Sequence, residues 1–341
     1  MTTPHLVLIA NAGDSTITVF ELRAGSLVPL SVASLPGACS TFAIDPDRDL
    51  AYAAVKGNPP AVLTLKLDRP TGSLENVGTT PIPEALAYLS LAPGGTVLLG
   101  AAYHAGKGWT RTIGDDGIGD PVSQIAFANL HCVITSADGR FAYFVSLGED
   151  LVAQFELSES GELSPLDPPT VSIPQGSGPR HLIIDGSGEN AYLQTEFSAQ
   201  AIRLRRDPGS GQLTLGEAVS IADPSAELGR SVFGADPLAN HYVWGADLHL
   251  AGERWLICSE RNASTLATVK IGPGGSLKQV VNLVVTQPQP RGFAVSPDGG
   301  LVVAVGERGT DASVYRVQED GRLTLAGEAP TGKGANWVRF A

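Results

Sequence analysis

The chain has 341 residues, of which 40 are glycine and 24 are proline, and only 17% are charged. A hydrophobic content of 43% can supply a sizeable core, so the composition excludes a disordered chain, a coiled coil and a collagen and favours many short strands joined by glycine and proline turns. The formal net charge of −12 argues against binding of a nucleic-acid backbone over a broad surface, because such binding needs a basic face.

The predicted strands follow a repeat. A Pro/Asp/Gly turn precedes an apolar strand at six places, which read IDPDRDLAYAA from Ile44, LAPGGTVLLGA from Leu91, TSADGRFAYFV from Thr135, IDGSGENAYLQ from Ile184, LAGERWLICSE from Leu250 and VSPDGGLVVAV from Val295. The starts lie 44 to 49 residues apart, except for one interval of 66. Pairs of alternating strands such as LVAQFELS and GELSPLDPPTVSI follow each turn, with glycine hairpins between them. A four-stranded unit of this length, repeated around an axis, is a β-propeller blade.

The chain begins and ends within one unit. LVLIAN from Leu6 resembles the strand that normally follows the turn, and the final GANWVRFA supplies a strand that would precede it. We therefore predict an all-β, seven-bladed propeller with four-stranded antiparallel blades, formed by residues 1–341 as a single domain and closed by the N- and C-terminal strands in one blade. Residues 222–244 account for the extra length of the 66-residue interval, and we interpret them as a crossover insertion and a candidate lid.

Polar residues gather where the predicted first, innermost strands begin and where the second strands end. In a propeller these points lie on one face, here called the mouth face. The residues singled out there are His131, Arg180, Glu196 and Arg261, together with His104, Lys107, His249, Gln289, Arg291, Lys333 and Asn336. Three guanidinium groups near one channel repel one another unless carboxylates or an anionic ligand compensate, so we expect the arginines to bind an anion.

Structural interpretations stand beside the functional ones. His131 and His249 can each be hydrogen-bonded core groups, and Asp247 can tie two blades together. His181 directly follows Arg180, so on a regular strand it points the other way and is structural. Glu196 can be an internal counter-ion, a catalytic base, or both.

Several other chemistries lack their motifs. There is no GxSxG elbow, HExxH helix or EF-hand loop, and no glycine run stands in a P-loop context. A mouth rich in arginine and histidine is unlike a calcium site, so we expect no metal and no cofactor.

The compartment is predicted from the cysteines and the N-terminus. Cys39, Cys132 and Cys258 are odd in number and widely spaced, which is typical of buried thiols in a reducing compartment. The first residues, MTTPHLVLIANAGDS, lack the basic and long apolar segments of a signal peptide, and no stretch approaches 18 apolar residues. We expect a cytoplasmic protein, a monomer or weak dimer, without nucleic-acid or membrane partners.

The segments GSGPRHLIID, WGADLHL, SERNAST, QPQPRGFAVSPDG and GKGANWV resemble the seven-bladed β-propeller lactonase family, of the bacterial 6-phosphogluconolactonase and carboxy-cis,cis-muconate lactonizing enzyme type. The resemblance extends over nearly the whole chain. It implies catalytic roles for His131, Arg180, Glu196 and Arg261. The stretch YHAGKGWTR around His104 and the terminal GANWV depart from the family's pattern, which leaves the substrate open.

The resemblance and the arginines together predict a lactone hydrolase that opens an anionic sugar lactone, a small substrate bearing phosphate or carboxylate. His131 or Glu196 would accept the proton of water, and Arg180 or Arg261 would stabilise the oxyanion. Two alternatives stay open: a carboxymuconate-type lactonizing cycloisomerase and a propeller that binds a ligand without catalysis.

Overall fold

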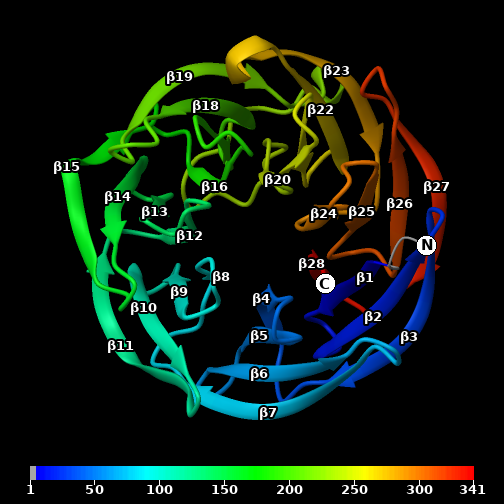
Figure 1. Ribbon diagram of the computed structural model, residues 1–341. Helices are drawn as coiled ribbons and strands as arrows, with labels where there is room; N and C mark the ends of the chain where they lie inside the picture. Colours follow the sequence, from blue (N-terminus) through cyan, green and yellow to red (C-terminus); the bar gives the residue numbers. More distant parts are fainter. Residues whose placement is uncertain (1–4) are drawn as a thin grey trace.

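The computed structural model describes residues 5–341, and the predicted seven-bladed propeller is confirmed (Figure 1). The blade that closes the ring contains, from the axis outwards, β28 (Ala335–Phe340), β1 (His5–Asn11), β2 (Thr16–Arg23) and β3 (Ser26–Ser34). The next two contain β4 (Cys39–Asp45), β5 (Leu50–Val55), β6 (Ala61–Asp68) and β7 (Ser73–Pro81), and β8 (Tyr88–Leu91), β9 (Val97–Ala102), β10 (Lys107–Gly114) and β11 (Gly117–Ala126).

The remaining four blades repeat this order. Two contain β12 (Leu130–Thr135), β13 (Phe141–Ser146), β14 (Leu151–Leu157) and β15 (Leu163–Ser172), and β16 (Pro179–Ile184), β17 (Asn190–Thr195), β18 (Gln200–Arg206) and β19 (Leu213–Ser220). Two contain β20 (Gly245–Ala251), β21 (Trp255–Glu260), β22 (Thr265–Ile271) and β23 (Leu277–Val285), and β24 (Phe293–Val295), β25 (Leu301–Val305), β26 (Asp311–Val317) and β27 (Leu323–Pro330). Short 3-10 helices are η1 (Pro224–Ala226) and η2 (Pro273–Gly275).

The two ends of the chain close the ring. Strand β1 pairs antiparallel with β28, with Val7 opposite Phe340 and Ile9 opposite Val338, as predicted. The indole of Trp337 is 1% exposed and donates from Nε1 to the Phe42 carbonyl at 3.0 Å, which ties the closing strand to the next blade. The closure pairs the inner edge of β1 and joins both ends of the chain in one four-stranded blade.

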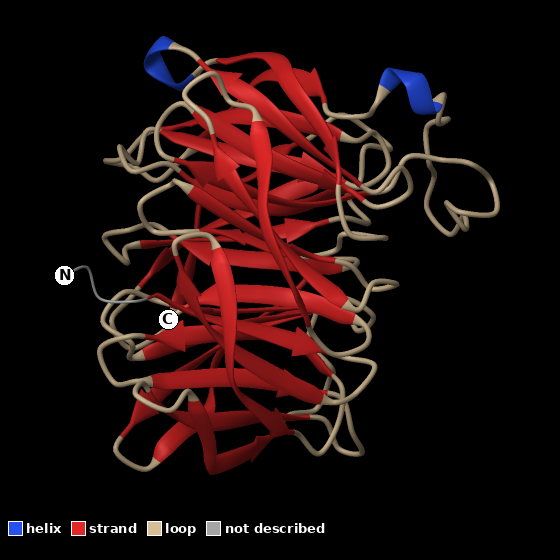
Figure 2. Cartoon of the chain, turned by 90° about the vertical axis from the view of Figure 1, so that its right-hand side faces the viewer, coloured by secondary structure: helices blue, strands red, loops and turns tan. Residues whose placement is uncertain are grey.

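The strands become more exposed with increasing distance from the axis. The second strand β5 is buried along almost its whole length, whereas the fourth strand β7 alternates between exposed and half-buried residues. Figure 2 shows the two faces of the ring edge-on, with loops on both sides. The 222–244 insertion, which carries η1, projects from the face opposite the chain ends. That face is the mouth face, because the loops from second to third strands and the crossovers from fourth to first strands lie there.

Candidate functional site

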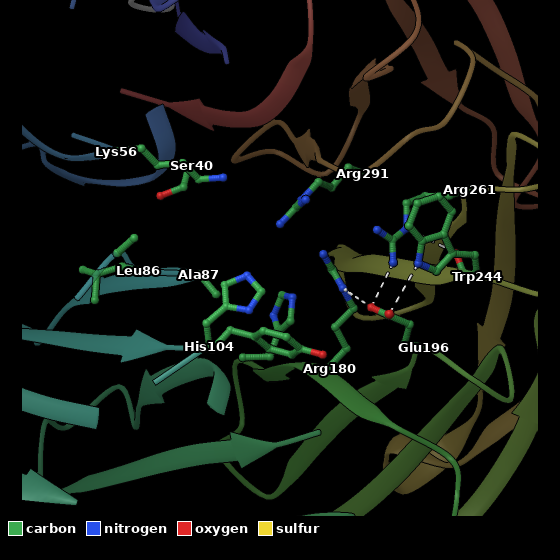
Figure 3. Close-up of a pocket in the computed structure, with 13 residues that line it drawn as sticks. Ser40, Lys56, Leu86, Ala87, His104, Arg180, Glu196, Trp244, Arg261 and Arg291 are labelled. Atoms are coloured by element: carbon green, nitrogen blue, oxygen red, sulfur yellow. Dashed lines mark hydrogen bonds and ion pairs between the residues drawn. The ribbon is translucent and has the colours of Figure 1, made fainter. Parts of the chain in front are cut away.

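A pocket of about 220 Å³ lies at the mouth end of the axis (Figure 3). Charged, aromatic and small apolar side chains from six blades and the insertion line it. The lining residues are Ser40, Lys56, Ala85, Leu86, Ala87, Tyr103, His104, His131, Arg180, Glu196, Trp244, Arg261 and Arg291.

Many of these residues occupy one repeated position. The mouth end of the first strand carries, blade by blade, Ser40, Ala87, His131, Arg180, Ala246, Arg291 and Asn336, which we call the inner ring. In three blades the pairing register between the first and second strands shifts by one residue. The shifts lie between Cys39 and Thr41, between Leu130 and Cys132, and between Pro179 and His181. Each shift is a β-bulge, which leaves the intervening residue out of the ladder and re-aims its side chain. The bulges therefore direct Ser40, His131 and Arg180 toward the axis.

A second repeated position completes the pocket. The residue that follows the second strand of a blade is Lys56, Tyr103, Glu196 or Arg261 in four of the blades, and all four residues line the cavity. In the Glu196 blade, close backbone approach needs glycine: a Cβ at Gly178 would lie 2.6 Å from the Phe197 ring. The Glu196 N–H donates to the Gly178 carbonyl at 2.7 Å, which holds the end of β17 against the start of β16.

The carboxylate of Glu196 lies between two arginines. Its Oε2 accepts from Nε of Arg180 at 3.0 Å and from NH2 of Arg261 at 2.9 Å, and its Oε1 accepts from Nε1 of Trp244 at 3.3 Å. The Arg261 guanidinium also stacks over the Trp244 ring, 3.7 Å from its centre. Burial lowers the pKa of Arg261 to about 9, so the group stays charged at neutral pH. The cluster is thus a carboxylate with two fixed guanidiniums.

Each of these arginines has one guanidinium nitrogen that makes no hydrogen bond within residues 5–341. NH1 of Arg180 donates to the Ala246 carbonyl and to His181, and its Nε is used by Glu196. In Arg261, NH2 and Nε are used by Glu196 and by backbone carbonyls. Within residues 5–341 this leaves NH2 of Arg180 and NH1 of Arg261 without a partner. Figure 3 shows both guanidiniums, and that of Arg291, directed toward the same central space.

His131 is a neutral imidazole at this site. Its side chain is buried, and its Nδ1 has no hydrogen-bond partner within the described chain. Burial, followed by the charge of Arg180, lowers its pKa well below the usual value. A neutral imidazole can accept a proton, so His131 has the form that a general base needs.

A layer of buried side chains closes the channel beneath the pocket. The ring of His181 packs edge-on against Tyr88 and Trp337, with centres 5.1 and 5.8 Å apart. Its Nδ1 lies 2.7 Å from Oδ1 of Asp247, whose Oδ2 lies 3.2 Å from Nε2 of His249. The expectation that His181 points away from Arg180 is wrong, because the bulge at Arg180 breaks the alternation and brings the two side chains into contact.

The bonding of His181 defines its tautomer. Arginine has donors only, so NH1 of Arg180 donates and Nε2 of His181, 3.1 Å away, accepts. The proton is then on Nδ1 and is donated to Asp247. Burial, and next the charge of Arg180, lower the pKa of His181 to about 3, in agreement with this neutral form. For Asp247, burial raises the pKa, but His249 and His181 outweigh burial and hold it well below the usual value.

Comparison with known proteins gives the family. The model of a family described as "Lactonase, 7-bladed beta-propeller" matches residues 6–340. The chain belongs to this family. A 6-phosphogluconolactonase of Serratia proteamaculans is 28% identical over 98% of both chains, and that of Pectobacterium carotovorum is also 28% identical over 98% of both. A periplasmic gluconolactonase of Pseudomonas aeruginosa has the same fold, with a TM-score of 0.85 at 23% identity over 99% of both chains.

In this member of the family, the four residues with implied catalytic roles share one pocket. His131 and Arg180 belong to the inner ring, and Glu196 and Arg261 follow second strands. His104 and Arg291 line the same cavity. The sequence analysis did not single out Lys56, Ser40 or Tyr103, although their equivalence to predicted site positions in the repeat was a usable signal.

The other predicted substrate-binding residues lie outside this cavity. Lys107 pairs with Glu84 at 2.5 Å, and Lys333 is exposed in the crossover before β28. His249 bonds Asp247 in the layer below. Gln289 donates to Glu307 at 2.6 Å, and Asn336 donates to the carbonyls of Cys39 and Ser40.

The insertion is anchored to the mouth. Asn262, beside Arg261, donates to the carbonyls of Pro237 and Tyr242 at 3.0 and 2.7 Å. The Ser231 N–H donates to the Phe197 carbonyl at 2.9 Å. The insertion ends at Trp244, which stacks on Arg261, so it supplies part of the pocket wall. Its action as a lid stays a prediction.

Three further observations concern the described chain, residues 5–341. No group of three or more His, Cys, Asp or Glu side chains is gathered closely enough to hold a metal ion. No helix there is both long enough and apolar enough to cross a membrane. All three cysteines are free and buried, as predicted.

Proposed function

We propose that this propeller lactonase hydrolyses a small lactone that carries an anionic group. The observation that carries the proposal is a pair of guanidinium nitrogens that have no partner in the described part of the chain, NH2 of Arg180 and NH1 of Arg261. They are held on either side of Glu196, next to neutral His131. The similarity to 6-phosphogluconolactonases supports the same reaction class.

The two guanidiniums act on the carbonyl oxygen. When water adds to a lactone carbonyl, negative charge develops on that oxygen. Donors that are already in position stabilise this charge without reorganising during the reaction. Arg180 is 1% exposed and is held by three partners, so its free NH2 is a preorganised donor. Arg261 is held in the same way by Glu196 and by stacking on Trp244.

His131 is the proposed base. It takes a proton from the attacking water while the water oxygen bonds to the carbonyl carbon. The ring C–O bond then breaks, and the proton passes to the leaving alkoxide, so the products are a hydroxyl and a carboxylic acid that ionises. The anionic substrate and the developing oxyanion offset the charge of Arg180, which raises the proton affinity of His131 during the reaction.

Glu196 is then a positioning residue. Its two oxygens accept hydrogen bonds from Arg180, Arg261 and Trp244, which hold the carboxylate in place between the two guanidiniums. Its charge lowers the repulsion between the two arginines and fixes the direction of their free nitrogens.

A lactone panel tests the proposal. Purified protein is assayed by proton release on 6-phosphogluconolactone, gluconolactone and carboxymuconolactone. We expect hydrolysis of at least one of them, and a loss of about 10²–10³ in kcat for Arg180→Gln and Arg261→Gln, as for other oxyanion donors. Hydrolysis at the background rate for all three, or wild-type kcat in both variants, would contradict it. Formation of a lactone from an unsaturated diacid would instead identify a cycloisomerase.

A further inference from the structure

A second cavity, here called the lower cavity, lies at the other end of the channel. It has a volume of about 450 Å³, and β4, β8 and β28, which are neighbours around the axis (Figure 1), supply most of its lining. Pro46 and Pro297, from turns between first and second strands, also line it, so it lies on the face opposite the mouth. No residue lines both this cavity and the mouth pocket. Most of its lining is apolar and includes Phe42, Ile44, Leu89, Leu91 and Phe340.

The layer of buried side chains that closes the channel lies between the two cavities. Tyr88 lines the lower cavity, and its ring packs edge-on against the rings of His181 and Trp337, with centres 5.1 Å apart in both pairs. On the other side of the layer, His181 contacts Arg180 of the mouth pocket. A ligand in the lower cavity therefore meets a different set of side chains from a lactone held at the mouth.

A single cation, Arg339, stands in this apolar lining. Regular pairing of β28 with β1 puts Arg339 on the same face of the strand as Trp337, and its guanidinium carbon lies 4.3 Å from the centre of the Trp337 ring. Its NH1 donates to the Val338 carbonyl at 2.8 Å, which is its one hydrogen bond within residues 5–341. It makes no ion pair there, even with the carboxylate of Ala341. A half-buried guanidinium normally has an anionic partner, because removing a charge from water is costly.

A hydroxyl group belongs to the same lining. Ser90 follows Tyr88 by two residues on β8, whose pairing with β9 is regular, so both side chains are on the channel face of the strand. The Oγ of Ser90 is buried and has no hydrogen-bond partner within the described chain. The lower cavity thus combines a cation without a counter-ion and a hydroxyl without a partner with a mainly apolar wall.

We propose that the lower cavity is a second binding site, for a small carboxylic acid with an apolar body. Nε and NH2 of Arg339, which have no partner within residues 5–341, present the two parallel N–H groups that a carboxylate accepts, and Ser90 is a further donor. The apolar body would lie against Phe42, Ile44 and Leu91. A few polar groups in an apolar lining are typical of small-molecule sites, and one cation matches one carboxylate.

Calorimetric titration with 4-phenylbutyrate tests the site. Its amide, 4-phenylbutanamide, has the same body without the charge, and acetate has the charge without the body. We expect the wild type to bind 4-phenylbutyrate about tenfold more tightly than either of them. Arg339→Gln should weaken binding of the acid about tenfold and Arg339→Lys about threefold, because lysine keeps the charge but lacks the parallel donors.

Two further variants control for long-range charge and for the arginines at the mouth. Arg140→Gln removes an exposed arginine from a turn between first and second strands on the same face, outside the cavity, and Arg261→Gln alters the mouth pocket. Both should keep the wild-type affinity for 4-phenylbutyrate. Melting temperatures show whether each variant is folded, and if Arg339→Gln is not, the fall in Arg339→Lys decides.

Several outcomes would overturn the site. These are absent binding, equal affinity for the acid and its amide, and wild-type affinity in the folded Arg339 variants. An equal loss in Arg140→Gln would reduce the effect to general charge. Binding that is lost in Arg261→Gln and kept in Arg339→Gln would place the acid at the mouth. Because the readout is binding alone, none of these results depends on whether the protein hydrolyses a lactone.

Discussion

The Nε2 atom of His181 lies 3.1 Å from NH1 of Arg180, so a residue in the layer that closes the channel holds a residue that points into the pocket. Asp247 holds the other nitrogen of the same imidazole at 2.7 Å. The direction of the Arg180 side chain therefore depends on a buried chain of hydrogen bonds as well as on Glu196.

Two replacements of His181 separate its two hydrogen bonds. An asparagine side chain can still donate to Asp247 but cannot reach Arg180, whereas the longer glutamine can present an acceptor to Arg180. We expect His181→Asn to lower kcat about tenfold, since Arg180 loses one of its fixed partners, and His181→Gln to recover part of that loss. Kinetics together with melting temperatures check this. Equal kcat in the two variants at similar stability would mean that His181 only fills space.

Acid should destabilise the protein in a defined range. The pKa of His181 is about 3 in the folded protein and ~6.5 in an unfolded chain. Between these two pH values the unfolded state binds a proton that the folded state does not. The lowered pKa of His131 acts in the same direction. The free energy of unfolding should fall by about 1.4 kcal/mol per pH unit for each histidine as the pH drops below ~6.5.

Urea unfolding at several pH values between 5 and 8 measures this slope. The His131→Asn, His181→Asn double variant lacks both groups and should show a shallower pH dependence, even if it is less stable at pH 8. A wild-type stability that stays constant from pH 8 to pH 5 would show that neither histidine is held neutral.

The activity profile reports on His131 as a base. Because burial and Arg180 lower its pKa, the imidazole stays neutral and active below pH 6.5, and kcat/KM should decline only at more acidic pH. His131→Asn should reduce kcat about 10²–10⁴-fold, the usual contribution of a general base. A pH–rate profile between pH 4.5 and 8 tests both points. An acid limb at or above pH 6.5, or near-normal turnover of the variant, would point to another base.

We predict hydrolysis without a metal ion. The three arginines and Lys56 around the pocket repel a divalent cation at the place where the carbonyl binds. Rates measured after dialysis against a chelator should equal those of untreated protein. A loss of activity that calcium or zinc restores would mean that a metal takes part despite these charges.

The sequence predicted the fold well because the repeat is visible in its turns. Six Pro/Asp/Gly turns have nearly constant spacing, and the strand from Leu6 lacks an inner neighbour that the segment at Trp337 supplies. The turn residues and the alternation of the strands are therefore sufficient to predict both the number of blades and the closure of the ring.

The site was only partly predictable, for a local reason. The shared position of His131 and Arg180 follows from the start of the first strands, but the direction of each side chain depends on a bulge. A bulge breaks the alternation of a strand without any glycine or proline at the bulged residue itself, so the contact between His181 and Arg180 could not be foreseen. Lys56 follows an apolar strand without a recognisable motif, so it was not predicted as a site residue. Lys107 and Lys333 lie in the motifs YHAGKGWTR and GKGANWV and were predicted, but they lie outside the pocket.

Five of the seven inner-ring residues line the pocket, one from each of five blades: Ser40, Ala87, His131, Arg180 and Arg291. The members of the inner ring come from separate sheets, and most of the buried core of each sheet lies farther from the axis. Ala87 has no polar group in its side chain and contributes only a methyl group to the pocket wall. Substrate choice in such a propeller can therefore change through single substitutions at these five equivalent positions while the blades that carry them stay the same, which separates the evolution of selectivity from the maintenance of the fold.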